Sequence, residues 1–358
     1  IINMYISLIL SGTSSFRGAE KSIEIFMKAL NLPYSAPSWT CGRLWLLRLG
    51  LYKLTCPKEK ANDWIWIVDH VTQLGETKCL AIYGIRIKTL LSLEEPLKFE
   101  DIEPLSIIPV DKSNGEIVLN QLEQTVEKTG VPREIIGDKG SDIKAGIDAF
   151  CKKHTETVYI YDIKHKAAII LKNEFKDNKL WKKFTELSNL TKQKIQQTPL
   201  AFLMPNNQRT KARFMNIDGI IDWGFKVLNF LDAQKNMPDK NLDQEVIKEK
   251  LGWIYDFEKP LKEWKRIVDI SDKVIKFIRS NGVFNNSYSM LKKEISGLSD
   301  MTERTRRVYD SLLDFARLEG LKASINEKLL GSSEIIESVF GKLKQIERDQ
   351  AKSGFTKL

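Results

Sequence analysis

The sequence has few cysteines and no long apolar run, and each absence excludes a class of protein. Its four cysteines are scattered without a Cys-x-x-Cys pair, which favours a reducing compartment over a disulfide framework. The apolar opening IINMYISLIL is too short to cross a membrane, and no basic segment marks it as a signal peptide. Internal repeats and low-complexity linkers are also missing. We therefore expect a cytoplasmic protein that does not enter a membrane.

Positive charge is in surplus along the 358 residues. Lys and Arg number 56 against 47 Asp and Glu, giving a net charge of +9 and a pI near 9.1. With 42% hydrophobic residues the chain can bury the cores of two or three ordinary domains. A basic surplus favours polyanionic partners, although many basic proteins bind no nucleic acid. The chain starts on Ile and stops at SGFTKL, which indicates that one or both ends are incomplete.

Residues 1–56 have the pattern of helices. The segment SSFRGAEKSIEIFMKAL has serine caps and apolar residues at helical spacing. After a turn with two prolines, SWTCGRLWLLRLGLYKL opens with Ser38 as an expected N-cap and is expected to end at Gly50. The second helix carries Arg43 and Arg48, which fits a DNA-binding helix-turn-helix. A plain helical hairpin is the alternative that the pattern leaves open.

From residue 62 the pattern changes to strands. DWIWIVD, TKCLAIYGIRI and LSIIPV follow one another, and then helices alternate with the strands VPREIIGD and ETVYIYD. This order predicts an α/β fold with a mixed sheet, in which strands end at Asp69, Asp138 and Asp162. Residues 163–330 show amphipathic helices and no strand run. A last helix begins at GSSEIIESVFGKLKQIERDQ, capped by Ser332 or Ser333.

Two aspartates at strand ends suggest a metal site. Ligands of open α/β sheets bind at the carboxyl ends of strands, where Asp69 and Asp138 are expected, and Gly140 near Asp138 would permit close approach. Mg²⁺ prefers such carboxylates, and two ions can clamp the attacking and leaving oxygens of a phosphoryl displacement. Glu334 or Glu337 would supply a third acid. The alternative is that these aspartates only shape turns and caps, as we expect for Asp142.

Four segments together resemble bacterial insertion-sequence transposases of the DDE class, which have a ribonuclease H-like catalytic core. They are WIWIVDHVTQLGETKCLAIYGI, VPREIIGDKGSDIKAGI, YIYDIKHKAAIILK and GSSEIIESVFGKLKQIERDQAKSGFT. The resemblance places the family acids on Asp69, Asp138 and Glu337, with Glu334 as the alternative third acid. Lys344 follows Glu337 by the spacing seen in some relatives. Ser333 stands where those relatives have an arginine, so the wider signature is incomplete.

The pair Asp162 and His165 resembles the Asp-x-x-His element that many DDE superfamilies carry between the second and third acids. It is expected to support the site at the edge of the same cleft. A zinc site of Cys151, His154 and His165 lacks the compact spacing of known sites. His70, beside Asp69, fits either a supporting role or ordinary packing.

The resemblance also implies a domain order and an activity. Residues 1–56 would form the helix-turn-helix region, 62–175 the first part of the catalytic core, 176–330 a helical insertion and 331–358 the core helix with the catalytic glutamate. The chain would cut transposon ends and join them to target DNA. It would use two Mg²⁺ ions, with Mn²⁺ as a substitute, and act as a homodimer on double-stranded DNA near the nucleoid.

Basic residues would neutralise the DNA backbone, although a solvated helix face is the favoured explanation of any single one of them. The candidates are Arg43, Arg48, Lys139, Lys164, Lys166, Arg209, Lys211 and Arg213, with a second cluster at Arg304, Arg306 and Arg307. One tryptophan among Trp181, Trp223, Trp253 and Trp264 could stack on a flipped base. Two other functions stay open: a DNA-binding remnant or regulator without catalysis, and a ribonuclease H-like nuclease that cuts without joining.

Overall fold

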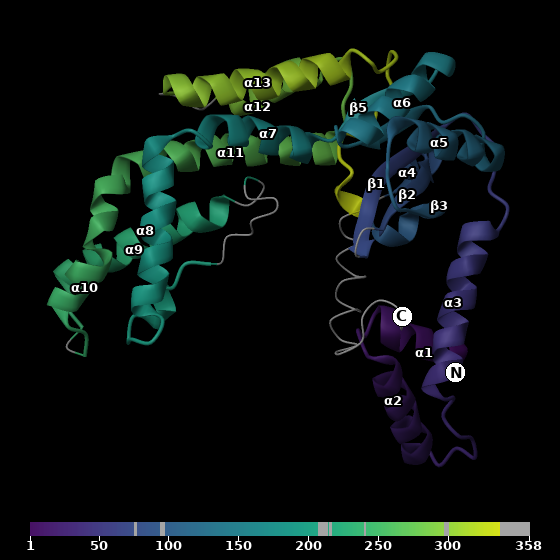
Figure 1. The fold of residues 1–358 in the computed structure, drawn as a ribbon, viewed down its shortest axis with the longest axis horizontal. Coiled ribbons are helices and arrows are strands. Elements are labelled where there is room, and N and C mark those ends of the chain that lie inside the picture. Colours follow the sequence, from purple (N-terminus) through teal and green to yellow (C-terminus); the bar gives the residue numbers. More distant parts are fainter. Residues whose placement is uncertain are drawn as a thin grey trace. The chain divides into compact units, whose positions relative to one another are not determined.

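The computed structural model describes residues 1–74, 77–93, 97–206, 214, 217–239, 241–296 and 301–336 (Figure 1). Contacts divide the chain into two compact units. The first combines Ile1–Tyr161 with the segment from Ser332 onward, and the second is Asp162–Gly331. Within the described residues, every helix is too short or too polar to cross a membrane.

The first unit is built on a five-stranded mixed sheet with the strand order β3-β2-β1-β4-β5. The strands are β1 (Trp64–Leu74), β2 (Thr77–Arg86), β3 (Glu103–Val110), β4 (Glu134–Gly137) and β5 (Val158–Tyr161). The first three pair antiparallel, while β4 is parallel to β1 and β5 is parallel to β4. The expected mixed α/β sheet is therefore present.

The strand β1 does not end at Asp69, contrary to the expectation from the sequence. Its antiparallel pairing with β2 continues through Asp69 and Ala81 as far as Leu74 and Thr77. The segment expected to be a long hairpin connection is therefore mostly strand. Only on the β4 side does the pairing stop early, after Val68 and Gly137. Asp69 thus lies where one neighbouring strand has ended and the other continues.

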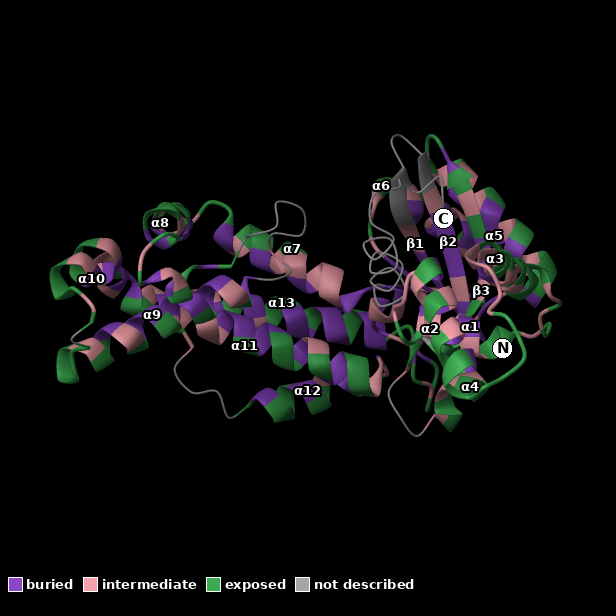
Figure 2. Ribbon diagram, turned by 90° about the horizontal axis from the view of Figure 1, so that it is seen from below, coloured by how far each residue is buried: buried purple, intermediate pink, exposed green. Residues whose placement is uncertain are grey.

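Two helices, α5 (Gly115–Thr129) and α6 (Ser141–Lys153), cover one face of this sheet. Their apolar residues pack on alternate residues of β1, including Trp66 and Val68, which are fully buried. A Cβ on Gly146 would lie 2.5 Å from Val118, so the glycine allows the two helices to approach closely. Buried residues follow β1 and β2 and the inner side of the helices (Figure 2).

Three helices precede the sheet: α1 (Ile2–Leu10), α2 (Phe16–Ala29) and α3 (Trp39–Thr55). Ser38 caps α3 as expected, but the helix continues past Gly50, because an exposed mid-helix glycine costs only about 1 kcal/mol relative to alanine. Residues 30–38 connect α2 to α3. This connection is longer than the three or four residues typical of a helix-turn-helix. The DNA-binding role of the region stays a prediction.

The second unit is helical throughout its described residues, apart from one isolated bridge between Val283 and Leu329. Its helices are α7 (Ile163–Phe175), α8 (Lys179–Ile195), α9 (Asp218–Asn236), α10 (Gln244–Leu251), α11 (Glu258–Asn281), α12 (Ser287–Ile295) and α13 (Glu303–Gly320). Within this unit α7, α11, α12 and α13 lie alongside one another, while α8, α9 and α10 gather at one end (Figure 1).

The remaining described elements are short: α4 (Ile87–Ser92) and the 3-10 helices η1 (Phe99–Asp101), η2 (Ala201–Leu203) and η3 (Gly252–Phe257). The helix α7, which the sequence analysis placed in the core, groups with the helical unit. The chain enters and leaves that unit at one point, where the Ile163 N–H donates to the Gly331 carbonyl at 3.1 Å.

Candidate functional site

The register of two parallel strands brings Asp69 and Asp138 to neighbouring positions. Val68 on β1 pairs with Gly137 on β4, and one aspartate follows each of them. Adjacent strands lie about 4.8 Å apart, so the two residues start from adjacent backbone positions at the end of the parallel ladder. Val68 packs towards α6, and alternation along the strand directs Asp69 to the opposite face of the sheet.

Both carboxylates are half-buried and oriented by nearby backbone amides. Asp69 Oδ1 accepts a hydrogen bond from the His70 amide at 2.7 Å, and Asp138 Oδ1 accepts one from the Gly140 amide at 2.9 Å. The Tyr159 hydroxyl donates to the backbone carbonyl of Asp138. An ionised carboxylate has about four acceptor sites, so each of these bonds orients its carboxylate through one oxygen.

Gly140 lies between two acidic side chains. A Cβ at this residue would lie 3.0 Å from Asp138 Oδ1 and 3.3 Å from Asp142 Oδ1. Its backbone φ of −51° is accessible to any residue, so the requirement for glycine here is space rather than conformation. A larger side chain would push on at least one of these carboxylates.

Asp142 is not the helix cap that the sequence analysis expected. The N-cap of α6 is Gly140, and Asp142 sits in the first turn, where its Oδ2 lies 2.9 Å from His70 Nε2. Burial would raise the pKa of Asp142. The adjacent Ser113 hydroxyl, the bond from His70 and the Ile143 amide outweigh burial and lower that pKa to about 2.

The pair of His70 and Asp142 was only partly visible in the sequence. His70 was recognised as a neighbour of Asp69, but its partner is far away in the sequence. Asp142 was also interpreted as a capping residue, and this interpretation left no reason to expect a contact with His70. The structure brings the two together because α6 packs on the same sheet face to which His70 points.

The third acid is not established. Glu337 and Lys344 lie outside the described residues. Glu334 is half-buried at the start of a helical turn, and its amide is 3.3 Å from the Ser332 hydroxyl. Across the part of the chain that the structure describes, no three His, Cys, Asp or Glu side chains form a group that could hold a metal ion. The zinc alternative is therefore unsupported.

Asp162 and His165 are related by a helix cap. Asp162 follows β5, is 1% exposed, and caps α7 by accepting a hydrogen bond from the His165 amide at 2.8 Å. A contact from an N-cap side chain to the amide three residues later accounts for the Asp-x-x-His spacing through the backbone. Both residues belong to the helical unit. Their expected role beside the carboxylates stays a prediction.

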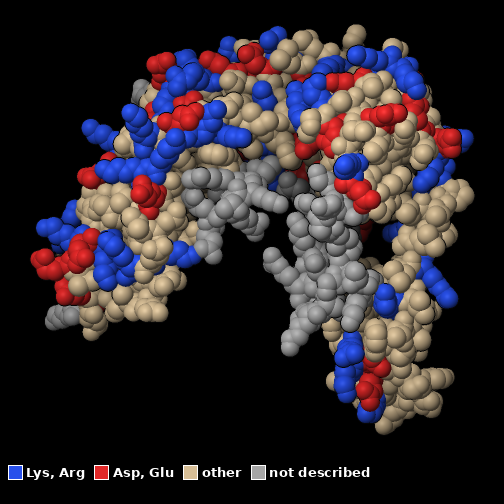
Figure 3. All heavy atoms as spheres, viewed as in Figure 1, with Lys and Arg blue, Asp and Glu red and all other residues tan. Residues whose placement is uncertain are grey.

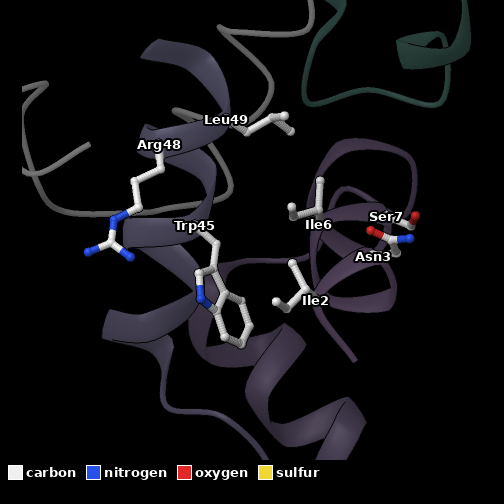
Figure 4. A pocket seen from close by; sticks show the side chains of 7 residues that line it. All are labelled: Ile2, Asn3, Ile6, Ser7, Trp45, Arg48 and Leu49. Carbon is white, nitrogen blue, oxygen red and sulfur yellow. The ribbon is translucent and has the colours of Figure 1, made fainter. Parts of the chain in front are cut away.

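The expected DNA-binding arginines of α3 differ in exposure. Arg43 is half-buried, whereas Arg48 is exposed and lines a pocket of about 510 Å³ between α1 and α3. Trp45 faces Ile2 and Ile6 across this pocket, and Arg48 extends outward from α3 (Figure 4). Arg48 is thus accessible to a phosphate, while the pocket itself is mainly apolar.

The other basic candidates lie in varied surroundings. Lys139 is exposed with its Nζ 4.5 Å from the ring centre of Tyr161, and Lys164 and Lys166 are half-buried on α7. Arg209, Lys211 and Arg213 lie outside the described residues. On the face drawn in Figure 3, Lys and Arg alternate with Asp and Glu instead of forming one basic patch. The charge surplus is therefore distributed over that face.

The tryptophans of the helical unit belong to an aromatic core. Trp181, Trp223 and Trp264 are at most 5% exposed. Trp253 is half-buried, its Nε1 donates to the Thr191 hydroxyl at 2.9 Å, and its ring lies 5.9 Å from that of Phe184. Trp181, Trp223 and Trp264 therefore pack inside the unit, while Trp253 lies at the edge of the same aromatic cluster.

Comparison with known proteins gives a likeness among solved structures. Neither a protein-family model nor a curated protein matches the chain. Among solved structures, the chain is similar to the Drosophila P element transposase strand transfer complex, with a TM-score of 0.40 and 12% identity. The alignment covers 98% of this chain and 90% of that chain. A likeness of this degree does not establish a common fold, so the proposal below rests on the site.

Proposed function

We propose that the chain is a metal-dependent polynucleotidyl transferase of the DDE transposase class. The observation that carries the proposal is the parallel register that sets Asp69 beside Asp138 at the end of the ladder. The strand order β3-β2-β1-β4-β5, with three antiparallel strands followed by two parallel ones, supports it, since this is the arrangement of ribonuclease H-like cores. The helical unit between β5 and Ser332 fits the insertion that the sequence resemblance implies.

The residues present fit Mg²⁺ better than a softer ion. Asp69 and Asp138 offer oxygen ligands only, and Gly140 keeps space beside the second carboxylate. Mg²⁺ in phosphoryl-transfer sites typically takes one or two protein carboxylates and completes its shell with water and substrate phosphate. Bound Mg²⁺ would supply the Lewis acidity that stabilises charge on the phosphate during displacement. Glu337, or else Glu334, would complete the ligand set.

The proposed reaction consists of two displacements at phosphorus. In the first, water breaks the phosphodiester at a transposon end and leaves a 3′-hydroxyl and a 5′-phosphate. In the second, that 3′-hydroxyl attacks a target phosphodiester, forms the new bond and releases a target 3′-hydroxyl. Asp69 and Asp138 would hold the ions, which would supply charge stabilisation at the reacting phosphate. Lys139, exposed next to Asp138, would neutralise a neighbouring phosphate. A homodimer would hold both ends.

The test is a cleavage and strand-transfer assay with Mg²⁺ or Mn²⁺, in which Asp138→Asn is compared with Asp148→Asn. Asp148 is an exposed carboxylate on α6 paired with Lys144, so it controls for loss of one acidic charge. We expect Asp138→Asn to lose both steps while retaining DNA binding, and Asp148→Asn to retain all three. Cleavage without joining by the unmodified protein would identify a nuclease. Binding without any cutting would overturn catalysis and leave a DNA-binding protein.

A further inference from the structure

A histidine–carboxylate pair joins β1 to α6 at the level of the two aspartates. His70 Nε2 and Asp142 Oδ2 are 2.9 Å apart, and the two side chains are only 18% and 19% exposed. Because an ionised carboxylate can only accept, the histidine Nε2 donates in this bond. A charge-assisted hydrogen bond in a largely desolvated place is stronger than one on the surface. The pair therefore restrains the two backbones that carry it.

Each member of the pair is attached to one of the two aspartates. His70 directly follows Asp69, and its amide donates to Asp69 Oδ1. Asp142 follows Asp138 in the chain on the first turn of α6, and Gly140 between them donates its amide to Asp138 Oδ1. The two segments are therefore connected twice. The parallel ladder joins them before the aspartates, at Val68 and Gly137, and the bond between His70 and Asp142 joins them after the aspartates.

The second connection limits how far apart the two segments can move at a metal site. Beyond Val68 and Gly137 the strands no longer pair, so the ladder alone does not fix the separation of the two chain segments. The bond between His70 and Asp142 provides the second attachment, on the sheet face opposite Asp69. Ligand positions must hold to about 0.5 Å for a productive site, and side chains that lock the ligand-bearing segments supply that precision.

We propose that His70 and Asp142 are positioning residues that set the separation of the Asp69 and Asp138 carboxylates for metal binding. The inference rests on the proposed function for the identity of the ligands. Neither residue touches substrate in this role. The pair acts through the backbone segments of residues 69–70 and 138–142, so its loss changes metal affinity before it changes DNA binding.

The test compares His70→Leu with His70→Gln in two measurements. The glutamine keeps an N–H donor at a similar reach, while leucine fills the space without a donor. Mn²⁺ affinity, measured by titration calorimetry without DNA, should fall on the order of tenfold in His70→Leu and recover in His70→Gln, since outer contacts of metal ligands have effects of this size. Asp142→Asn should weaken Mn²⁺ binding in the same direction. The double variant should be no worse than His70→Leu, because the two residues act as one unit.

The second measurement needs no metal. Amide exchange at Gly140 reports its bond to Asp138, and it should become faster in His70→Leu but not in His70→Gln. His154→Leu is the matched control. His154 Nε2 lies 3.2 Å from Glu123 Oε2 with similar exposure, at the other end of α6. This variant should leave both the Gly140 exchange and the Mn²⁺ affinity unchanged.

The outcomes separate this inference from the proposed function. If Asp138→Asn abolishes Mn²⁺ binding while His70→Leu binds within twofold of the unmodified protein, the positioning role is wrong. If Asp138→Asn binds Mn²⁺ as well as the unmodified protein does, the proposed metal site is wrong. In that case the Gly140 amide decides the inference, because unchanged exchange in His70→Leu refutes coupling of the pair to Asp138.

Discussion

Val68 and Gly137 face each other across the parallel ladder of β1 and β4, and each is followed by an aspartate. The two acids are therefore brought together by backbone hydrogen bonds rather than by a loop. A slip of the register by one residue would turn Asp69 towards α6 and separate the acids. Burial of Trp66 and Val68 on the α6 face opposes such a slip, so the hydrophobic core also protects the site.

Substitution of Gly140 by alanine should disturb metal binding more than stability. The new Cβ would lie 3.0 Å from Asp138 Oδ1, so that carboxylate must rotate or the loop must shift. We expect Mn²⁺ affinity to fall several-fold and the melting temperature to change little, because the φ of −51° suits alanine. Calorimetric titration and thermal melts of Gly140→Ala and Gly252→Ala provide the comparison. A Cβ on Gly252 would meet only ordinary contacts, 3.6 Å from Lys248, so that variant should keep its affinity.

The low pKa of Asp142 predicts how stability depends on pH. A carboxyl with a folded pKa of about 2, against an ordinary value of 3.8, stabilises the fold above pH 4 and loses this contribution as pH falls towards 2. Each pKa unit corresponds to about 1.4 kcal/mol, and allowing for partial exposure we expect Asp142→Asn to cost about 1–2 kcal/mol at pH 7. Urea unfolding at pH 7, 4 and 2.5 should show this difference shrinking with acid. A difference that persists undiminished at pH 2.5 would contradict the assignment.

Arg304 should stabilise the helical unit rather than bind DNA. On α13, its Nε lies 2.6 Å from Glu174 of α7 and its Nη1 lies 3.0 Å from Glu263 of α11. All three side chains are less than a quarter exposed, so removal of the arginine leaves two carboxylates without their shared partner. We expect Arg304→Ala to cost about 2 kcal/mol, and Arg306→Ala on the same helix to cost less than about 0.5 kcal/mol.

Tryptophan fluorescence can follow this unfolding, since Trp181 and Trp264 lie in the core of the same unit. DNA affinity, measured for both variants at the same salt concentration, is the control and should not change in Arg304→Ala. If Arg304→Ala weakens DNA binding and leaves the unfolding midpoint unchanged, the arginine contacts DNA and the structural role is wrong.

Local signals in the sequence predicted where some helices begin but not where all of them end, since α3 continues past Gly50. Ser38 caps α3 as expected, and α5 ends at Gly130, whose φ of 85° is rarely adopted by other residues. The length of β1 could not be predicted in the same way. Its residues beyond Asp69 are held by pairing with β2 across the hairpin, and such pairing is not visible in the polar pattern of HVTQL.

The sequence singled out residues of the candidate site but not how they are arranged. Asp69 and Asp138 stood out because each follows a strand pattern, but their adjacency depends on the β1–β4 register, which only the fold sets. Asp142 was interpreted as a helix cap because it lies next to the expected start of a helix. Its pairing with His70 required the packing of α6 on the sheet. Glu337 remains a prediction.

The helical unit is inserted between two parts of the first unit, and the Ile163 amide donates to the Gly331 carbonyl where the insertion begins and ends. The unit starts at Asp162, directly after β5 ends at Tyr161, and it ends at Gly331, directly before the first unit resumes at Ser332. A short linker in place of residues 163–331 would span the same gap and close a much shorter loop, which lowers the entropic cost of forming the sheet. Evolution could therefore lengthen, shorten or replace the helical unit without changing the strand order of the first unit.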